Sequence, residues 1–390
     1  MSGQKTLVIH GGTYKTGSSA IQLYLYRADI RGQLGADVSY PVTGRGIGAI
    51  QHGNLIAELR GGHAFSPERG TWDDLFAEIV AGPHPTTIVS SENFAALVPE
   101  RLRVIGQKAT AAGVRVRWVH YLREQAGFHN AFYVERLVNM RPEFAELVDL
   151  PFEDFAAWSP IDVGYLSRYA SFADELRAAI PGVELAFRPF ARDELVDGDV
   201  VTDFCSVVGI PHVAGSAEET NVGTGWRTVE TARLLTPLVA QRRLRTRIEH
   251  LPDWHAIRMR WIALIRSELV GVTDELGWND RSAIYLTPEF RATLLAEYAE
   301  ENRRVAAFAG FDWPAIIARE SDKPYNVGTL DEIRASELAQ VYDRVLRVVL
   351  EPPAEILELI EKVEPTALRS GPIGPGLARR AARYARRRLG

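Results

Sequence analysis

The sequence of 390 residues contains a single cysteine, Cys205. One thiol cannot form a disulfide within the chain, and it cannot supply a cysteine-rich metal site. Disulfides are rare in the reducing cytoplasm, so this composition fits a cytoplasmic protein. We therefore predict no metal site and a cytoplasmic localisation.

Long apolar runs are also missing. TLVIH at residues 6–10 and RVLRVVL near residue 345 fall far short of the roughly 20 residues that cross a bilayer. A glycine-rich turn and Lys15 interrupt the first twenty residues, where a signal peptide would continue its apolar segment. We therefore expect no membrane span and no signal peptide.

Neither sign of charge dominates the chain. The formal net charge is −5, with 46% hydrophobic and 24% charged residues, which is the balance of a globular protein with a sizeable core. The segment from Leu377 onward is an exception, because it carries arginines and no acid: Arg379, Arg380, Arg383, Arg386, Arg387 and Arg388. This basic tail predicts a peripheral contact with an anionic membrane or with another subunit, and a solvated terminus is the alternative. We predict no nucleic-acid partner, and the oligomeric state stays open.

Strand-like and helix-like patterns alternate in the first half of the chain. Short apolar runs with the composition of β-strands occupy residues 6–10, 86–91, 114–122 and 183–190. Helical spacing of apolar residues occurs at 71–81, 99–112, 124–139 and 163–180. This order predicts an α/β fold, with a three-layer parallel sheet covered by helices on both faces.

After residue 226 the pattern is helical almost throughout. We predict an α/β core at residues 1–225, a helical part at 226–318 packed on the core, and a helical extension at 319–390 that includes the arginine tail. A separate helical lobe is the alternative to packing on the core. Segments rich in polar residues, proline and glycine, at 319–335 and 364–376, are expected to be connections.

The segment GGTYKTGSS (11–19) lies between the first predicted strand and a helical pattern. Small residues let backbone N–H groups gather around an anion, and the following helix directs its positive end to the same point. Lys15 adds a full positive charge. The segment therefore predicts a phosphate or sulfate site, although a glycine turn that only joins strand to helix is the alternative.

This loop departs from the common nucleotide-binding pattern GxxxxGK[ST]. Gly12 and Gly17 have the required spacing, but Ser18 takes the lysine position and Lys15 precedes Gly17 by two residues. The arrangement resembles the 5′-phosphosulfate loop of sulfotransferases that use 3′-phosphoadenosine 5′-phosphosulfate (PAPS), where a strand leads into PKTGTT or PKTGSS and a helix. The matching positions are Lys15, Thr16, Gly17, Ser18, Ser19 and Gln22, with Tyr14 in place of the usual proline.

The resemblance implies a P-loop-like fold and a role for each matched residue. Lys15 would stabilise the leaving phosphate, and the residues that would hold the 5′-phosphate are Thr16, Gly17, Ser18 and Ser19. In this family an arginine at the end of a later strand binds the 3′-phosphate, and WVHYLREQ (118–125) places Arg123 there. The family serine eight residues further on is Ala131 in this chain, so Asn130 or His129 is the candidate substitute. Three further segments look like bacterial carbohydrate-type sulfotransferases: GADVSYP (35–41), VSSENF (89–94) and the stretch 188–210 with a later Asn221.

Sulfo transfer to a hydroxyl needs a base, because the attacking oxygen loses its proton as it bonds to sulfur. The candidates are His52, Glu92 and Asp37. We favour His52, whose residue type titrates near neutral pH and which resembles a histidine of bacterial relatives. Glu92 ends the second predicted strand on the same rim as Arg123, and a helix-start acid is the alternative interpretation.

These features predict a sulfotransferase that moves the sulfo group of PAPS to a hydroxyl of a glycan, a lipid-linked saccharide or a small metabolite, with adenosine 3′,5′-bisphosphate (PAP) as product. A nucleotide kinase would share the anion loop but would use ATP and Mg²⁺, and the chain has no clear strand-end DxxG motif. A non-catalytic module that binds anions or a membrane surface through the arginine tail is a second alternative.

Overall fold

The computed structural model describes residues 4–46, 48–61, 64–140, 148–158, 166–212, 223–240, 254–351 and 353–363. The chain divides into two compact units, each made of separate segments. The first unit comprises Met1–His129, Ser159–Asn221 and Glu289–Lys323, and the second comprises Asn130–Trp158, Val222–Pro288 and Pro324–Gly390. The predicted parts follow the order of the chain, whereas these units interleave along it. The arginine tail from Leu377 lies outside the described residues.

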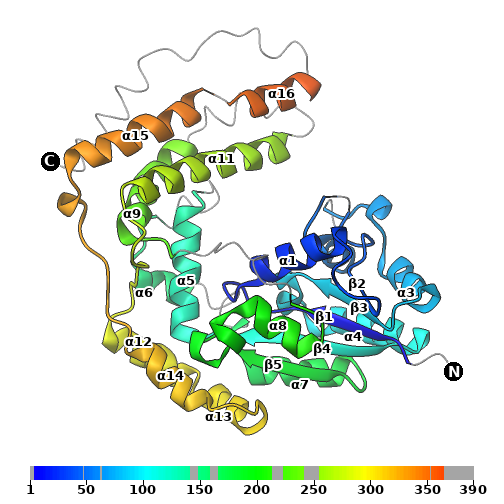
Figure 1. Ribbon diagram of the computed structural model, residues 1–390. Coiled ribbons are helices and arrows are strands. Elements are labelled where there is room, and N and C mark those ends of the chain that lie inside the picture. Colours follow the sequence, from blue (N-terminus) through cyan, green and yellow to red (C-terminus); the bar gives the residue numbers. More distant parts are fainter. Residues whose placement is uncertain are drawn as a thin grey trace. The chain divides into compact units, whose positions relative to one another are not determined.

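A five-stranded parallel sheet forms the centre of the first unit (Figure 1). The strands are β1 (Thr6–His10), β2 (Val38–Ser39), β3 (Thr86–Ser90), β4 (Arg115–Leu122) and β5 (Glu184–Pro189), in the spatial order β2-β3-β1-β4-β5. Four of these strands lie within one residue of the predicted bounds, which confirms the α/β class and the parallel sheet. The two-residue strand β2 was not predicted, because two residues carry no readable periodicity.

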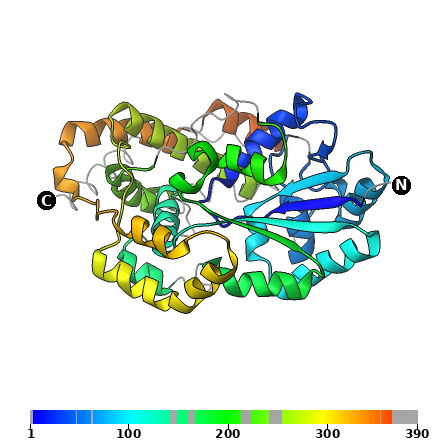
Figure 2. The same cartoon turned by 60° about the horizontal axis from the view of Figure 1, so that its bottom comes forward.

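Helices cover both faces of this sheet, as Figure 2 also shows. Successive strand residues point to opposite faces, so Leu7 and Ile9 join one apolar core while Val8 joins the other. The first core includes side chains of α2 (Gly53–Arg60), α3 (Trp72–Ala81), α4 (Pro99–Ala112) and α7 (Tyr169–Ala179). The second core includes side chains of α1 (Ser18–Ile30) and α8 (Val200–Val208). The predicted three-layer arrangement is therefore present.

The remaining helices of the first unit come from the segment after residue 288. They are α12 (Pro288–Glu297), α13 (Ala299–Phe308) and α14 (Trp313–Ser321). The sequence predicted an almost unbroken helical pattern here, and the structure interrupts it at Tyr298. Helix α14 occupies residues at the start of the predicted connection 319–335, so that boundary was placed too early. The predicted connection 364–376 lies outside the described residues.

The second unit is mainly helical. Its helices are α6 (Phe152–Trp158), α9 (Trp226–Ala240), α11 (Trp254–Glu275), α15 (Ala335–Leu350) and α16 (Ala354–Val363), together with most of α5 (Gln125–Val138), which begins in the first unit. α11 packs against α9, α15 and α16. Within the described part of the chain, no helix has both the length and the apolar character needed to cross a membrane.

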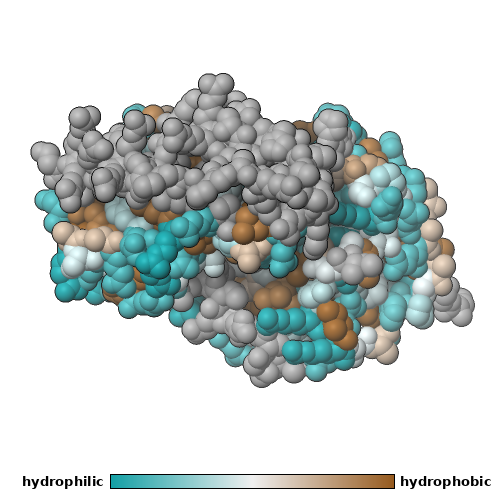
Figure 3. Space-filling model, turned by 90° about the horizontal axis from the view of Figure 1, so that it is seen from above, coloured by the Kyte–Doolittle hydropathy of each residue, from teal (hydrophilic) through white to brown (hydrophobic). Residues whose placement is uncertain are grey.

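Hydrophilic residues cover much of the described surface that is visible in Figure 3, with hydrophobic residues between them in small groups. Exposed hydrophobic residues in small numbers are normal for a globular protein. Among the described large hydrophobic residues that are exposed, Tyr325 is the only aromatic one, and 50% of it is accessible.

Candidate functional site

The loop at residues 11–17 leaves the carboxyl end of β1, the central strand of the sheet. Two of its glycines are required by close packing. A Cβ atom on Gly11 would lie 2.7 Å from the indole of Trp118. Gly17 has φ of 76°, and a Cβ there would lie 2.7 Å from Val200 Cγ1. The glycines therefore let the loop lie directly on β4 and α8.

Lys15 has a left-handed backbone with φ of 64°. This conformation is uncommon for a residue other than glycine, and such strained residues cluster at functional sites. The conformation is held by neighbours on both sides. Arg123 Nη1 donates to the Lys15 carbonyl at 2.9 Å, and Thr16 Oγ1 donates to the Thr13 carbonyl at 2.6 Å.

The amino end of α1 has no side-chain cap, and its first turn contains no acid. Its backbone N–H groups therefore keep their partial positive charge. The hydroxyl of Ser18 is buried there without a hydrogen-bond partner among the described residues. A Cβ on Gly12 would lie 3.6 Å from Ser18 Oγ and 3.3 Å from His10 Nε2, which likewise has no partner in the described part of the chain. An oxyanion held at this point could satisfy such donors.

Arg123 follows β4 at the same carboxyl edge of the sheet. Besides its bond to the Lys15 carbonyl, its guanidinium lies 6.0 Å from the ring centre of Phe190, and its carbonyl accepts a 2.7 Å hydrogen bond from the Tyr169 hydroxyl. Burial lowers the pKa of Arg123, which is the penalty for placing this charge away from water. A bound anion would offset that penalty, so the geometry suits a phosphate contact.

Glu92 lies beside the loop. It begins the short 3₁₀ helix η2 (Glu92–Ala96) after β3, and Gln22 of α1 donates to its Oε2 at 3.3 Å. The next residue, Asn93, accepts a 2.6 Å hydrogen bond from the Tyr14 hydroxyl. The structure therefore brings Glu92, Gln22, Lys15 and Arg123 to one edge of the sheet, as the sequence predicted. Ser19 is exposed in the first turn of α1.

The position of His52 does not suit a general base, which is the role that the sequence predicted for this residue. Its side chain is fully buried, and burial lowers its pKa to about 3. Nδ1 accepts from the Ser90 backbone N–H at 3.1 Å, so Nε2 carries the proton and donates to the Pro41 carbonyl at 3.1 Å. Both ring nitrogens therefore hold backbone segments together, and no lone pair is left for a substrate proton.

Asp37 is exposed, and its carbonyl accepts from the N–H of Thr86, the first residue of β3. It therefore lies at the amino edge of the sheet, opposite the loop.

Both candidate substitutes for the family serine are buried and bond to other residues, although Nδ1 of His129 has no hydrogen-bond partner among the described residues. Asn130 donates to the Ala283 carbonyl at 3.0 Å and accepts from the Tyr285 N–H at 2.8 Å, so its amide joins two backbone groups of the second unit. His129 is buried, and its Nε2 bonds to the Tyr298 hydroxyl at 3.0 Å. The sequence could not show this, because each partner is more than 150 residues away.

Sequence reasoning missed His10 and Tyr169. His10 is buried under the loop with Nδ1 2.7 Å from Ser90 Oγ, and burial lowers its pKa to about 3. The sequence could have indicated His10, because this residue ends the predicted strand and directly precedes Gly11 and Gly12. Tyr169 holds the backbone of Arg123 from a helix 46 residues away, and nothing in the local sequence indicates that contact.

These contacts are the basis for assigning chemistry to the site. No family model matches the chain, and the comparisons with curated proteins and with solved structures found no match either.

Proposed function

We propose that this protein is a sulfotransferase of P-loop-like fold that moves a sulfo group from PAPS to an acceptor hydroxyl. The observation that carries the proposal is the combination of an uncapped α1 amino end, a buried Ser18 hydroxyl without a partner among the described residues, and two cationic residues, Lys15 on the loop and Arg123 after β4, that meet at the Lys15 carbonyl. The loop follows the central strand, and ligands of open α/β sheets bind at the carboxyl ends of the strands.

The described residues fit a ligand that carries two anionic groups. Thr16 already uses its hydroxyl inside the loop, so it would contribute its backbone N–H to the 5′-phosphate, together with the N–H and hydroxyl of Ser18. Arg123 would bind the 3′-phosphate with the guanidinium N–H groups that do not contact Lys15. PAPS supplies an activated sulfo group. Lys15 would stabilise the negative charge that develops on the departing phosphate.

We assign the general base to Glu92 in place of His52. A carboxylate at the rim of the loop can accept the proton of a hydroxyl, whereas both nitrogens of His52 are occupied. Gln22 donates to Glu92 Oε2, which orients the carboxylate and leaves its other oxygen for the acceptor. Gln22 would thus act as a positioning residue.

A nucleotide kinase is the nearest competing function, because it would use the same type of loop. The serine in the lysine position of GxxxxGK[ST] favours sulfo transfer over ATP chemistry. Consumption of labelled PAPS is expected to continue in EDTA, and a requirement for Mg²⁺ would favour the kinase.

Calorimetric titration with PAP and with ADP tests the nucleotide assignment. ADP lacks the 3′-phosphate, so we expect it to bind at least about tenfold more weakly than PAP, as loss of a charge-assisted contact predicts. Arg123→Lys keeps the charge but loses the paired guanidinium N–H groups, so it should reduce the difference in affinity between PAP and ADP. Equal affinities of the wild-type protein for the two nucleotides would refute the assignment.

A further inference from the structure

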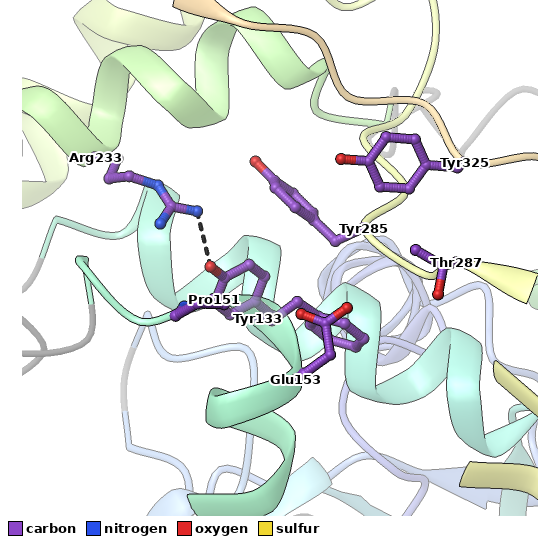
Figure 4. A pocket seen from close by; sticks show the side chains of 8 residues that line it. Tyr133, Pro151, Glu153, Arg233, Tyr285, Thr287 and Tyr325 are labelled. Atoms are coloured by element: carbon purple, nitrogen blue, oxygen red, sulfur yellow. Dashed lines mark hydrogen bonds between the residues drawn. The ribbon is translucent and has the colours of Figure 1, made fainter. Parts of the chain in front are cut away.

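The second unit contains a pocket of about 300 Å³, at the lower end of the range for small-molecule sites, about 300 to 1,000 Å³. Helices α5, α6 and α9 and two loop segments contribute its wall, which Figure 4 shows from close by. The side chains that matter here are Tyr133, Glu153, Arg233, Tyr285, Thr287 and Tyr325. Convergence of so many chain segments on one cavity requires the folded unit.

One wall of the pocket is a fixed aromatic corner. The rings of Tyr133 and Tyr285 stand 5.1 Å apart at 87°. The Tyr133 hydroxyl donates to the Leu150 carbonyl and accepts from Arg233 Nη2, both at 2.7 Å, and the Tyr285 hydroxyl donates to Glu230 at 2.6 Å. These bonds hold both rings in place before any ligand binds, which lowers the entropic cost of binding.

The lining of the pocket also includes Tyr325, which is half exposed. The backbone beside it is held by two hydrogen bonds between Ile284 and Asn326, of 3.2 and 2.9 Å. Asn130 also hydrogen-bonds to the backbone of Ala283 and Tyr285, the residues on either side of Ile284. Tyr325 therefore presents an accessible aromatic face from an anchored backbone, and this exposed apolar surface is available to a ligand.

The charges of the pocket disfavour an anion. Arg233 pairs with Glu230 at 3.2 Å, so the two charges largely compensate each other. Glu153 lies on the pocket wall and is exposed. The pocket thus offers an acceptor in Glu153, N–H donors in Arg233 and a hydroxyl in Thr287, in addition to its aromatic faces. The cationic loop of the first unit has the opposite character.

We propose that this pocket binds the ring of a sugar. A pyranose has a face of C–H groups that can lie on Tyr325, and its hydroxyl groups require both donors and acceptors around the rim. A wholly apolar ligand would cover the Glu153 carboxylate and the remaining N–H groups of Arg233 without offering them hydrogen bonds, at a desolvation cost. A quaternary ammonium ion could use the aromatic rings and Glu153. A quaternary ammonium group offers no hydrogen-bond acceptor to Arg233, whereas the hydroxyl groups of a sugar do. The inference does not depend on the proposed sulfo transfer.

Saturation-transfer NMR with the full-length protein and three methyl glycosides, of glucose, galactose and mannose, tests the proposal. We expect transfer to the C–H protons of at least one glycoside, and affinity about tenfold weaker in Tyr325→Ala. Tyr325→Phe retains the ring and should retain most of the affinity. Glu153→Gln should weaken binding, whereas Asp154→Asn, on the same helix but not on the pocket wall, should not.

Choline chloride serves as the competing probe. No transfer to any of the glycosides, or equal transfer in wild type and Tyr325→Ala, would overturn the proposal. Binding of choline in place of the glycosides would identify a cation site instead. Because Tyr325 is half exposed, its replacement is expected to leave the thermal unfolding midpoint unchanged, which separates lost contact from lost folding.

Discussion

The sheet unit and the helical unit build their candidate sites by different means. In the sheet unit the groups of the site come largely from backbone geometry: a glycine loop, a left-handed Lys15 and the amino end of α1. In the helical unit the pocket is made of side chains from separate segments, such as Tyr133, Tyr285 and Tyr325. A site formed by the backbone of one segment can be recognised in the local sequence. A site formed by the packing of distant segments cannot. The two sites should therefore respond independently to mutation.

The largest expected effect is on turnover at the loop. Lys15→Ala removes a charge that faces the leaving phosphate, so turnover of labelled PAPS should fall by about two to three powers of ten. Tyr325→Ala in the other unit is the matched control for nucleotide binding and should leave PAP affinity unchanged. Near-normal turnover in Lys15→Ala would remove this residue from the proposed mechanism.

The assignment of Glu92 as the base predicts that mutation of Glu92 lowers turnover, whereas mutation of His52 lowers stability. Glu92→Gln should lose about two powers of ten in turnover and keep its thermal unfolding midpoint, because it removes a proton acceptor at the rim. His52→Ala leaves the Ser90 N–H and the Pro41 carbonyl unpaired in the interior, which should cost about 2 to 4 kcal/mol of unfolding free energy. A stable but inactive His52→Ala protein would restore the histidine as base.

Acid should destabilise the first unit through its buried histidines. Burial lowers the pKa to about 3 for His10, His52 and His120, well below the unfolded value of 6.5. The unfolded chain then binds more protons between these values, so stability is complete above pH 6.5 and falls as the pH drops toward 3. At pH 5 each of these histidines should lower the free energy of unfolding by about 2 kcal/mol.

Hydrogen exchange as a function of pH locates this effect. Protection relative to the intrinsic exchange rate at each pH should fall at pH 5 in β1, β3 and β4 before it falls in α11 and α15. His120→Gln should reduce the pH dependence of the thermal unfolding midpoint. Simultaneous loss of protection in both units would contradict the expected difference between them.

The smallest expected effect concerns Asn130, which sequence reasoning placed at the nucleotide. Asn130→Ala should lower the stability of the second unit by about 1 to 3 kcal/mol, because two buried backbone groups lose their partner. PAP affinity should stay the same in a calorimetric titration. Asn130→Asp keeps the acceptor for the Tyr285 N–H and should be less damaging. A large loss of PAP affinity in Asn130→Ala would support the sequence-based role.

The sequence predicted those parts of the fold and site in which local pattern determines structure. Strand β1, the glycine loop and Arg123 follow from short apolar runs of β-strand composition, from the glycine spacing, and from the rule that parallel strands end at one edge. His52 was misjudged because residue type says nothing about burial, which changed its pKa and occupied both nitrogens. The contact of Tyr169 with Arg123 and the role of Asn130 could not be predicted from the sequence, since these contacts join segments far apart in the chain.

Interleaving of the units also constrains how the protein can fold during synthesis. Val305, Trp313 and Ile316 belong to the same apolar core as Leu7 and Ile9 of β1. The ribosome must therefore release more than 300 residues before one face of the sheet can be completed. Until then the emerging chain would expose part of that core to water and to other nascent chains. A fragment that ends at residue 225 is accordingly expected to aggregate or to require a chaperone, although it contains all five strands and the entire anion loop.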